Sequence, residues 1–200
     1  MAITFTYNQE QALKGGQPNF ITETGAYIVK ILQAKYARST NGAEALEFSI
    51  ETEDGLKGDY ISIFYKAKNG DSLQNGINLI QAIMGCTNTQ QLSISRSNDC
   101  DIAPELTGKK VGLFLQKELY TKNNGQDGYR LQIVCPFGAQ TRKTLSEHLE
   151  NKAPERIQWL VEHYKDKDSR NTQQQAVSAQ NQLYSAPQQT NNFEEDNIPF

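Results

Sequence analysis

Several residue types that enzymes and secreted domains depend on are scarce in this sequence of 200 residues. Its three cysteines form no Cys-x-x-Cys pair, which argues against a disulfide framework and a zinc site. It has two histidines and no His-Glu-x-x-His, Gly-x-Ser-x-Gly or Walker-type motif. No apolar run reaches the roughly 18–20 residues of a membrane span, and the N-terminus lacks a basic region followed by an apolar stretch. We therefore expect a cytoplasmic protein that is no enzyme and holds no metal or cofactor.

Positive charge is absent from the end of the chain. Residues 171–200 contain Glu194, Glu195 and Asp196 but no Lys or Arg, whereas residues 1–170 hold the other 20 acids and all 20 bases. The main part of the chain is therefore neutral, and the net charge of -3 belongs to the tail. A neutral body binds a polyanion only where its cations gather on one face, so the bulk charge gives no support to nucleic-acid binding.

Composition changes sharply after Lys165. Residues 171–192 are rich in Gln and Asn, with too few large apolar residues to offset the entropy of ordering the backbone. We therefore divide the chain into a folded domain at 1–165, a disordered linker at 166–192 and an acidic terminal peptide at 193–200. A terminal Phe200 behind three acids has no folding role in such a tail, so the peptide is expected to be held by a partner.

The folded domain consists mainly of predicted strands. Strand patterns cover 25–38, 45–51 and 59–66, and a helix follows, capped at Asp71 or Ser72 and with apolar residues at helical spacing over 73–84. Two more strands cover 109–120 and 128–134. This order predicts a mainly β OB-fold, a five-stranded barrel with a helix between strands three and four. An apolar stripe after Pro154 predicts a C-terminal helix packed on the barrel.

Binding of a single strand requires flat rings that stack on bases and cations close to the phosphates. Alternation in the third strand places Ile61 and Ile63 in the core and Tyr60 and Phe64 on the outer face. Phe114 is predicted to point outwards, on the same side as Arg130, and ring–cation pairs recur at the strand ends. The predicted nucleic-acid-binding residues are Tyr36, Arg38, Tyr60, Phe64, Lys66, Lys68, Phe114, Lys117, Tyr120, Lys122 and Arg130.

The end of the tail resembles a known family. Asp196, Ile198, Pro199 and Phe200 are similar to the acidic Ile-Pro-Phe tip of bacterial single-stranded DNA-binding proteins. The Gly25-Ala26-Tyr27 start of the first strand and the strand–helix block from Gly58 to Gly85 resemble the single-stranded DNA-binding proteins of phages and prophages. The bacterial tetramer does not carry over, so a homo-oligomer stays an open possibility.

The resemblance implies sequence-independent binding and protection of single-stranded DNA in the cytoplasm of a bacterial host cell. It also implies that the tip recruits replication, recombination and repair proteins. The residues expected to carry this recruitment are Phe193, Glu194, Glu195, Asp196, Ile198, Pro199 and Phe200.

Two other functions stay open on the sequence. In the first, the barrel binds a protein instead of nucleic acid, and the chain is an adaptor with the tail as its second contact. In the second, Glu47, Glu51 and Asp59 gather a metal ion and the chain is a nuclease or recombination enzyme. Alternating acids of this kind are more often the solvated side of a strand, which favours the binding functions.

Overall fold

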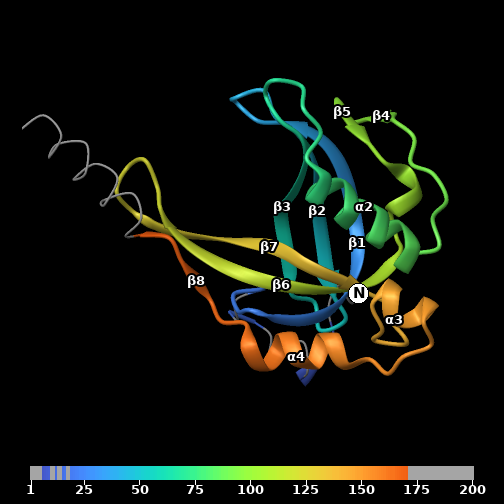
Figure 1. Ribbon diagram of the computed structural model, residues 1–200. Coiled ribbons are helices and arrows are strands. Elements are labelled where there is room, and N and C mark those ends of the chain that lie inside the picture. Colours follow the sequence, from blue (N-terminus) through green and yellow to red (C-terminus); the bar gives the residue numbers. More distant parts are fainter. Residues whose placement is uncertain (1–5, 10–11, 13–14, 17–18, 171–200) are drawn as a thin grey trace, which may run out of the picture.

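The computed structural model describes residues 6–9, 12, 15–16 and 19–170. The sequence from 171 to 192 and the terminal peptide at 193–200 lie outside these residues. The described chain is mainly β, as predicted, and its strands join into one curved sheet (Figure 1). The strands that the sequence predicted are β1 (Gly25–Arg38), β2 (Glu44–Thr52), β3 (Lys57–Lys66), β6 (Lys110–Thr121) and β7 (Asp127–Phe137).

β1 is shared by the two halves of the sheet. Its first part, from Gly25 to Lys30, pairs with β6, and its part from Val29 to Arg38 pairs with β2. The two regions overlap at Val29 and Lys30. A register shift between Ile31 and Gln33 lies just beyond this overlap, and bulges of this kind bend a strand. β3 and β7 lie at the outer ends of the two halves, and no hydrogen-bonded ladder joins them within the described residues. The sheet is therefore curved without being closed.

Helix α2 (Gln74–Cys86) follows β3 and packs across one end of the sheet. It begins later than predicted, because Ser72 bridges to Lys66 and Leu73 donates its backbone N–H to the Tyr65 carbonyl. Asp71 and Ser72 therefore do not cap it. Gly76 packs tightly on β3, since a Cβ at this position would stand 1.8 Å from the carbonyl oxygen of Phe64.

Two apolar cores hold the fold. The larger contains inward-facing residues of β1, β2, β3 and β6 together with Ile83 of α2. The smaller lies on the other side of β6, where Phe114 and Phe137 pack against Ile157 and Leu160 of α4 (Glu155–His163). The predicted C-terminal helix on the sheet is therefore present.

Phe114 corrects one of the predicted binding residues. It does lie on the opposite side of β6 from Leu113 and Leu115, as alternation requires. That side is covered by the end of the C-terminal helix, and the Tyr164 ring meets the Phe114 ring edge-on at 5.6 Å. Phe114 is fully buried, so it cannot stack on a base.

Several short elements were not predicted. β4 (Ser95–Ser97) and β5 (Cys100–Ile102) form a hairpin beside β1, and η1 (Pro104–Leu106) and α3 (Leu145–Leu149) are single turns. β8 (Lys167–Asp168) pairs in parallel with β6, so residues 166–170 are structured rather than the start of the linker. No helix in the described part of the chain is long and apolar enough to span a membrane.

Candidate functional site

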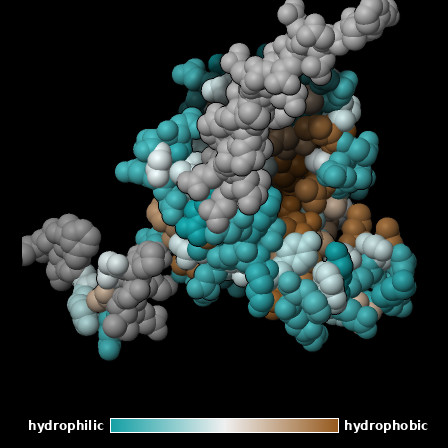
Figure 2. Space-filling model, turned by 60° about the vertical axis from the view of Figure 1, so that its left-hand side comes forward, coloured by the Kyte–Doolittle hydropathy of each residue, from teal (hydrophilic) through white to brown (hydrophobic). Residues whose placement is uncertain are grey.

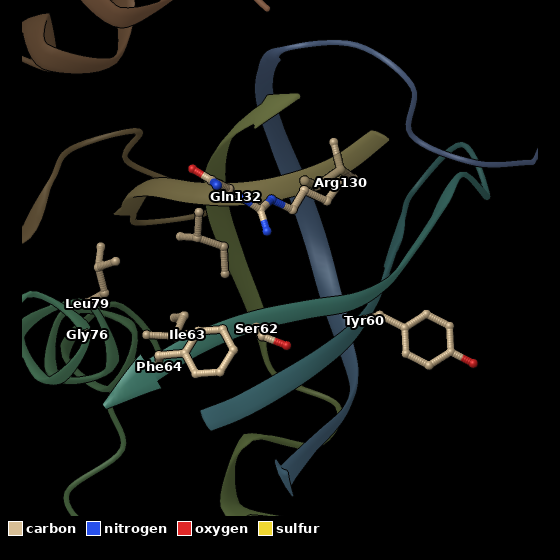
Figure 3. A pocket seen from close by; sticks show the side chains of 10 residues that line it. Tyr60, Ser62, Ile63, Phe64, Gly76, Leu79, Arg130 and Gln132 are labelled. Carbon is tan, nitrogen blue, oxygen red and sulfur yellow. The ribbon is translucent and has the colours of Figure 1, made fainter. Parts of the chain in front are cut away.

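A groove runs between the facing edges of β3 and β7. Its volume of about 520 Å³ falls within the range of small-ligand sites, roughly 300–1,000 Å³. The two strands form its walls, and α2 stands at one end (Figure 3). The residues that line it are Tyr60, Ser62, Ile63, Phe64, Gly76, Leu79, Arg130, Leu131, Gln132 and Ile133.

Tyr60 stands on β3 in an unusual backbone conformation. Its φ is 59°, in the left-handed region that costs a non-glycine residue about 1–2 kcal/mol. Phe48 pairs with Ile61 but Ile50 pairs with Gly58, so Tyr60 lies in a β-bulge. The bulge turns the ring away from the other lining residues, and the side chain is 80% exposed (Figure 3). Strained, exposed residues of this kind cluster at binding sites, which makes Tyr60 a functional candidate.

Phe64 and Ser62 continue the β3 wall towards α2. Phe64 is 43% exposed, although most large apolar rings of a sheet with two apolar cores are buried. The prediction that Tyr60 and Phe64 stand on the outer face of β3 therefore agrees with their exposure. The Phe64 ring and the Ser62 hydroxyl therefore share the β3 wall, and the Tyr60 ring projects outward from the end of that wall away from α2.

Arg130 and Gln132 form the polar part of the opposite wall. Both side chains donate to Glu118 Oε2 on β6, Arg130 through Nε at 2.7 Å. The Glu118 side chain is only 3% exposed, and its hydrogen bond from Arg130 outweighs burial and holds the pKa of this carboxyl at about 2. A charged Glu118 therefore fixes the direction of both groove residues at neutral pH.

The lining suits a flat, largely apolar group with a polar edge. Arg130 is the one charged residue among the described lining residues, and Ser62 and Gln132 add neutral donors and acceptors. An isolated phosphate would lose much of its hydration against Ile63, Leu79 and the other apolar walls. An aromatic ring that carries amide-like edges would meet both kinds of partner.

Most of the other predicted cations are already paired with acids. Lys66 and Arg38 both approach Glu44 Oε1, at 3.3 and 3.8 Å, and Lys117 contacts Asp166 at 3.4 Å. Lys68 and Lys122 are exposed and have no ion-pair partner among the described residues. Among the predicted binding residues, these two lysines are therefore the cations most open to an incoming phosphate.

The two remaining predicted rings take different positions. Tyr120 lies close to the groove, because the Arg130 guanidinium sits 5.8 Å from its ring centroid. Tyr36 instead lines a separate apolar pocket with Tyr65 and Ile80 beside α2, and it donates to the Ser93 carbonyl at 3.3 Å. Burial raises the pKa of Tyr36. The structure thus gathers Tyr60, Phe64 and Arg130 around one groove and leaves Tyr36 outside it.

Glu118 is a residue of the candidate site that sequence reasoning missed. A signal for it exists in the hairpin register, because the turn at Asn123 to Gly125 places Glu118 directly opposite Arg130. An acid facing a base across a hairpin predicts an ion pair. Its burial could not be read from the sequence, since it depends on the return of the chain as β8.

The proposed acidic metal site receives no support from the geometry. No group of three or more His, Cys, Asp or Glu side chains within the described residues is placed to hold a metal ion. Glu47 is paired with Lys35, at 2.8 Å.

The space-filling view shows apolar surface gathered on one face between hydrophilic regions (Figure 2).

Comparison with known families finds no family model that matches this chain. A search among curated proteins likewise finds no match.

Proposed function

We propose that this protein binds single-stranded DNA without sequence preference, as a non-enzymatic, cytoplasmic single-stranded DNA-binding protein of phage or prophage type. The body is then an OB fold. Five main strands with a helix between the third and fourth, and a first strand shared between two half-sheets, support that architecture. OB folds bind oligonucleotides on an open strand face, and the groove between β3 and β7 borders the outer face of β3.

One observation carries the proposal. Phe64 presents an exposed ring on one wall of a groove whose other wall carries Arg130, and the exposed Tyr60 ring projects outward from the same strand, at the end of the groove away from α2. Aromatic rings offer stacking that every base can use, and a planar guanidinium adds cation–π contacts. Such a surface binds unstacked bases, which a duplex keeps inside its helix.

The neutral charge of the body is compatible with this function. Bases held by stacking need few phosphate contacts, and Lys68 and Lys122 supply cations close to strand ends. The tip from Phe193 to Phe200 then recruits replication, recombination and repair proteins, since its acids and terminal ring suit a basic, apolar pocket. This recruitment rests on the sequence of the tail alone.

Titration of the purified protein with fluorescent oligo-dT at two salt concentrations tests the proposal. We expect the affinity for oligo-dT to fall as the salt concentration rises. An unlabelled duplex of equal length should not displace the oligonucleotide, and the oligonucleotide should stay intact in Mg²⁺. Absence of binding would favour a protein-binding adaptor, and cleavage would favour a nuclease.

A further inference from the structure

The last described residues of the chain form a strap across β6. We use this name for Asp166 to Arg170, which contain β8. Asp166 accepts from the Thr24 hydroxyl at 2.7 Å, the backbone N–H of Ser169 donates to the Leu119 carbonyl at 2.9 Å, and Arg170 contacts Asp127 at 2.8 Å. The strap is thus fixed at both ends and runs beside the β6–β7 hairpin (Figure 1).

Glu118 joins the strap to the groove wall. Its Oε1 pairs with the Lys167 ammonium at 3.0 Å and accepts a hydrogen bond from the Ser169 hydroxyl at 2.6 Å. Its Oε2 accepts hydrogen bonds from the side chains of the groove residues Arg130 and Gln132. The strap therefore holds one oxygen of this buried carboxylate, and the groove residues hold the other. Both sets of donors together fix its orientation.

We propose that Glu118 and the strap are positioning elements of the groove. Lys167 and Ser169 hold the Glu118 carboxylate, and the carboxylate in turn holds the Arg130 guanidinium and the Gln132 amide in their binding directions. This inference rests on the proposed function for its effect on DNA affinity. It also means that residues directly before the linker, far from the groove in sequence, take part in the site.

Positioning increases affinity because a long side chain loses conformational entropy when it binds a ligand. The Arg130 side chain is 60% exposed, so without a fixed partner it would sample many rotamers, each of which must be given up on binding. A carboxylate held on both oxygens removes that freedom before the ligand arrives. Removing the strap contacts leaves Glu118 free to turn, and Arg130 with it.

Two point variants of the full-length chain test the positioning. Ser169→Ala removes one donor to Glu118 without changing charge, and Lys167→Ala removes the other. Lys165→Ala is the matched control, since it removes an exposed lysine two residues away whose side chain makes no contact with Glu118. Loss of one hydrogen bond should weaken oligo-dT binding about three- to tenfold in each strap variant and leave the control near wild type.

Coupling to Arg130 separates positioning from general destabilisation. In an Arg130→Gln background the strap variants should cost clearly less further affinity than in the wild type, because only the Gln132 amide is left for them to position. An equal loss in both backgrounds, or wild-type affinity in the strap variants, would overturn the proposal.

A second measurement is independent of DNA. The Arg130 Nε–Hε resonance should exchange slowly with water in the wild type, and faster in Ser169→Ala and Lys167→Ala but not in Lys165→Ala. Unchanged exchange in the strap variants would refute the positioning. If the wild type fails to bind oligo-dT, the proposed function falls, while the positioning is still decided by this resonance.

Discussion

Acidification should remove a defined part of the stability of this fold through Glu118. The pKa of its carboxyl falls from 4.5 to about 2 in the folded protein, chiefly because Arg130 donates to it. At about 1.4 kcal/mol for each unit of pKa, this corresponds to at most about 3.5 kcal/mol. Arg130 and Lys167 are 60% and 52% exposed, so solvent screening reduces the expected contribution to about 1–2 kcal/mol.

The sign follows from the lowered pKa. A carboxyl whose folded pKa is depressed stabilises the protein above its unfolded pKa, and that stability is lost as the pH falls from 4.5 towards 2. Glu118→Gln cannot ionise, so it should be less stable than wild type at pH 7, by about 1–2 kcal/mol. The difference between the two proteins should shrink by more than half at about pH 3.

Urea unfolding followed by circular dichroism at both pH values measures this difference. Subtracting the variant from the wild type cancels the titration of the other acids, which both proteins share. A difference that is the same at pH 7 and at the lower pH would show that the ionised form of Glu118 does not stabilise the fold, and the account of the buried carboxylate would be wrong.

Three further predictions concern binding. Tyr60→Gly should relieve the positive φ and stabilise the fold by about 1 kcal/mol while weakening oligo-dT binding by about 1–3 kcal/mol, and a variant that loses stability or keeps full affinity would contradict this. Lys68→Gln and Lys122→Gln should each flatten the slope of log affinity against log salt by about 0.7, and an unchanged slope would remove that lysine from the site. Phe200→Ala keeps every acid of the tail, so DNA affinity should stay near wild type. The variant should no longer capture replication and recombination proteins from a bacterial lysate, and neither should a protein without the tip.

Sequence reasoning succeeded where a pattern is local. Alternation identified the outer face of β3, including Tyr60 and Phe64, and the main strands fall close to their predicted bounds. It failed where a distant segment covers a surface. Phe114 points to the side that alternation requires, but the C-terminal helix buries it.

Other features of the site depend on backbone detail that composition does not encode. The bulge in which Tyr60 has its positive φ arises from a register shift between β2 and β3, and no glycine or other turn residue at that position predicts it. The pairing of Lys66, Arg38 and Lys117 with acids likewise depends on which strands become neighbours. The number of predicted cations therefore overstated how many are free to meet phosphate.

The groove between β3 and β7 is a furrow on the surface with α2 at one end, where Gly76 leaves no space between the helix and the strand. Under the proposed function, a chain of nucleotides enters this furrow from the side, because the described residues leave it open to solvent. Loading therefore requires no free 5′ or 3′ terminus. Closed circular single strands should be coated as readily as linear ones of the same length, and the protein should be able to occupy a gap whose two ends are both held in duplex.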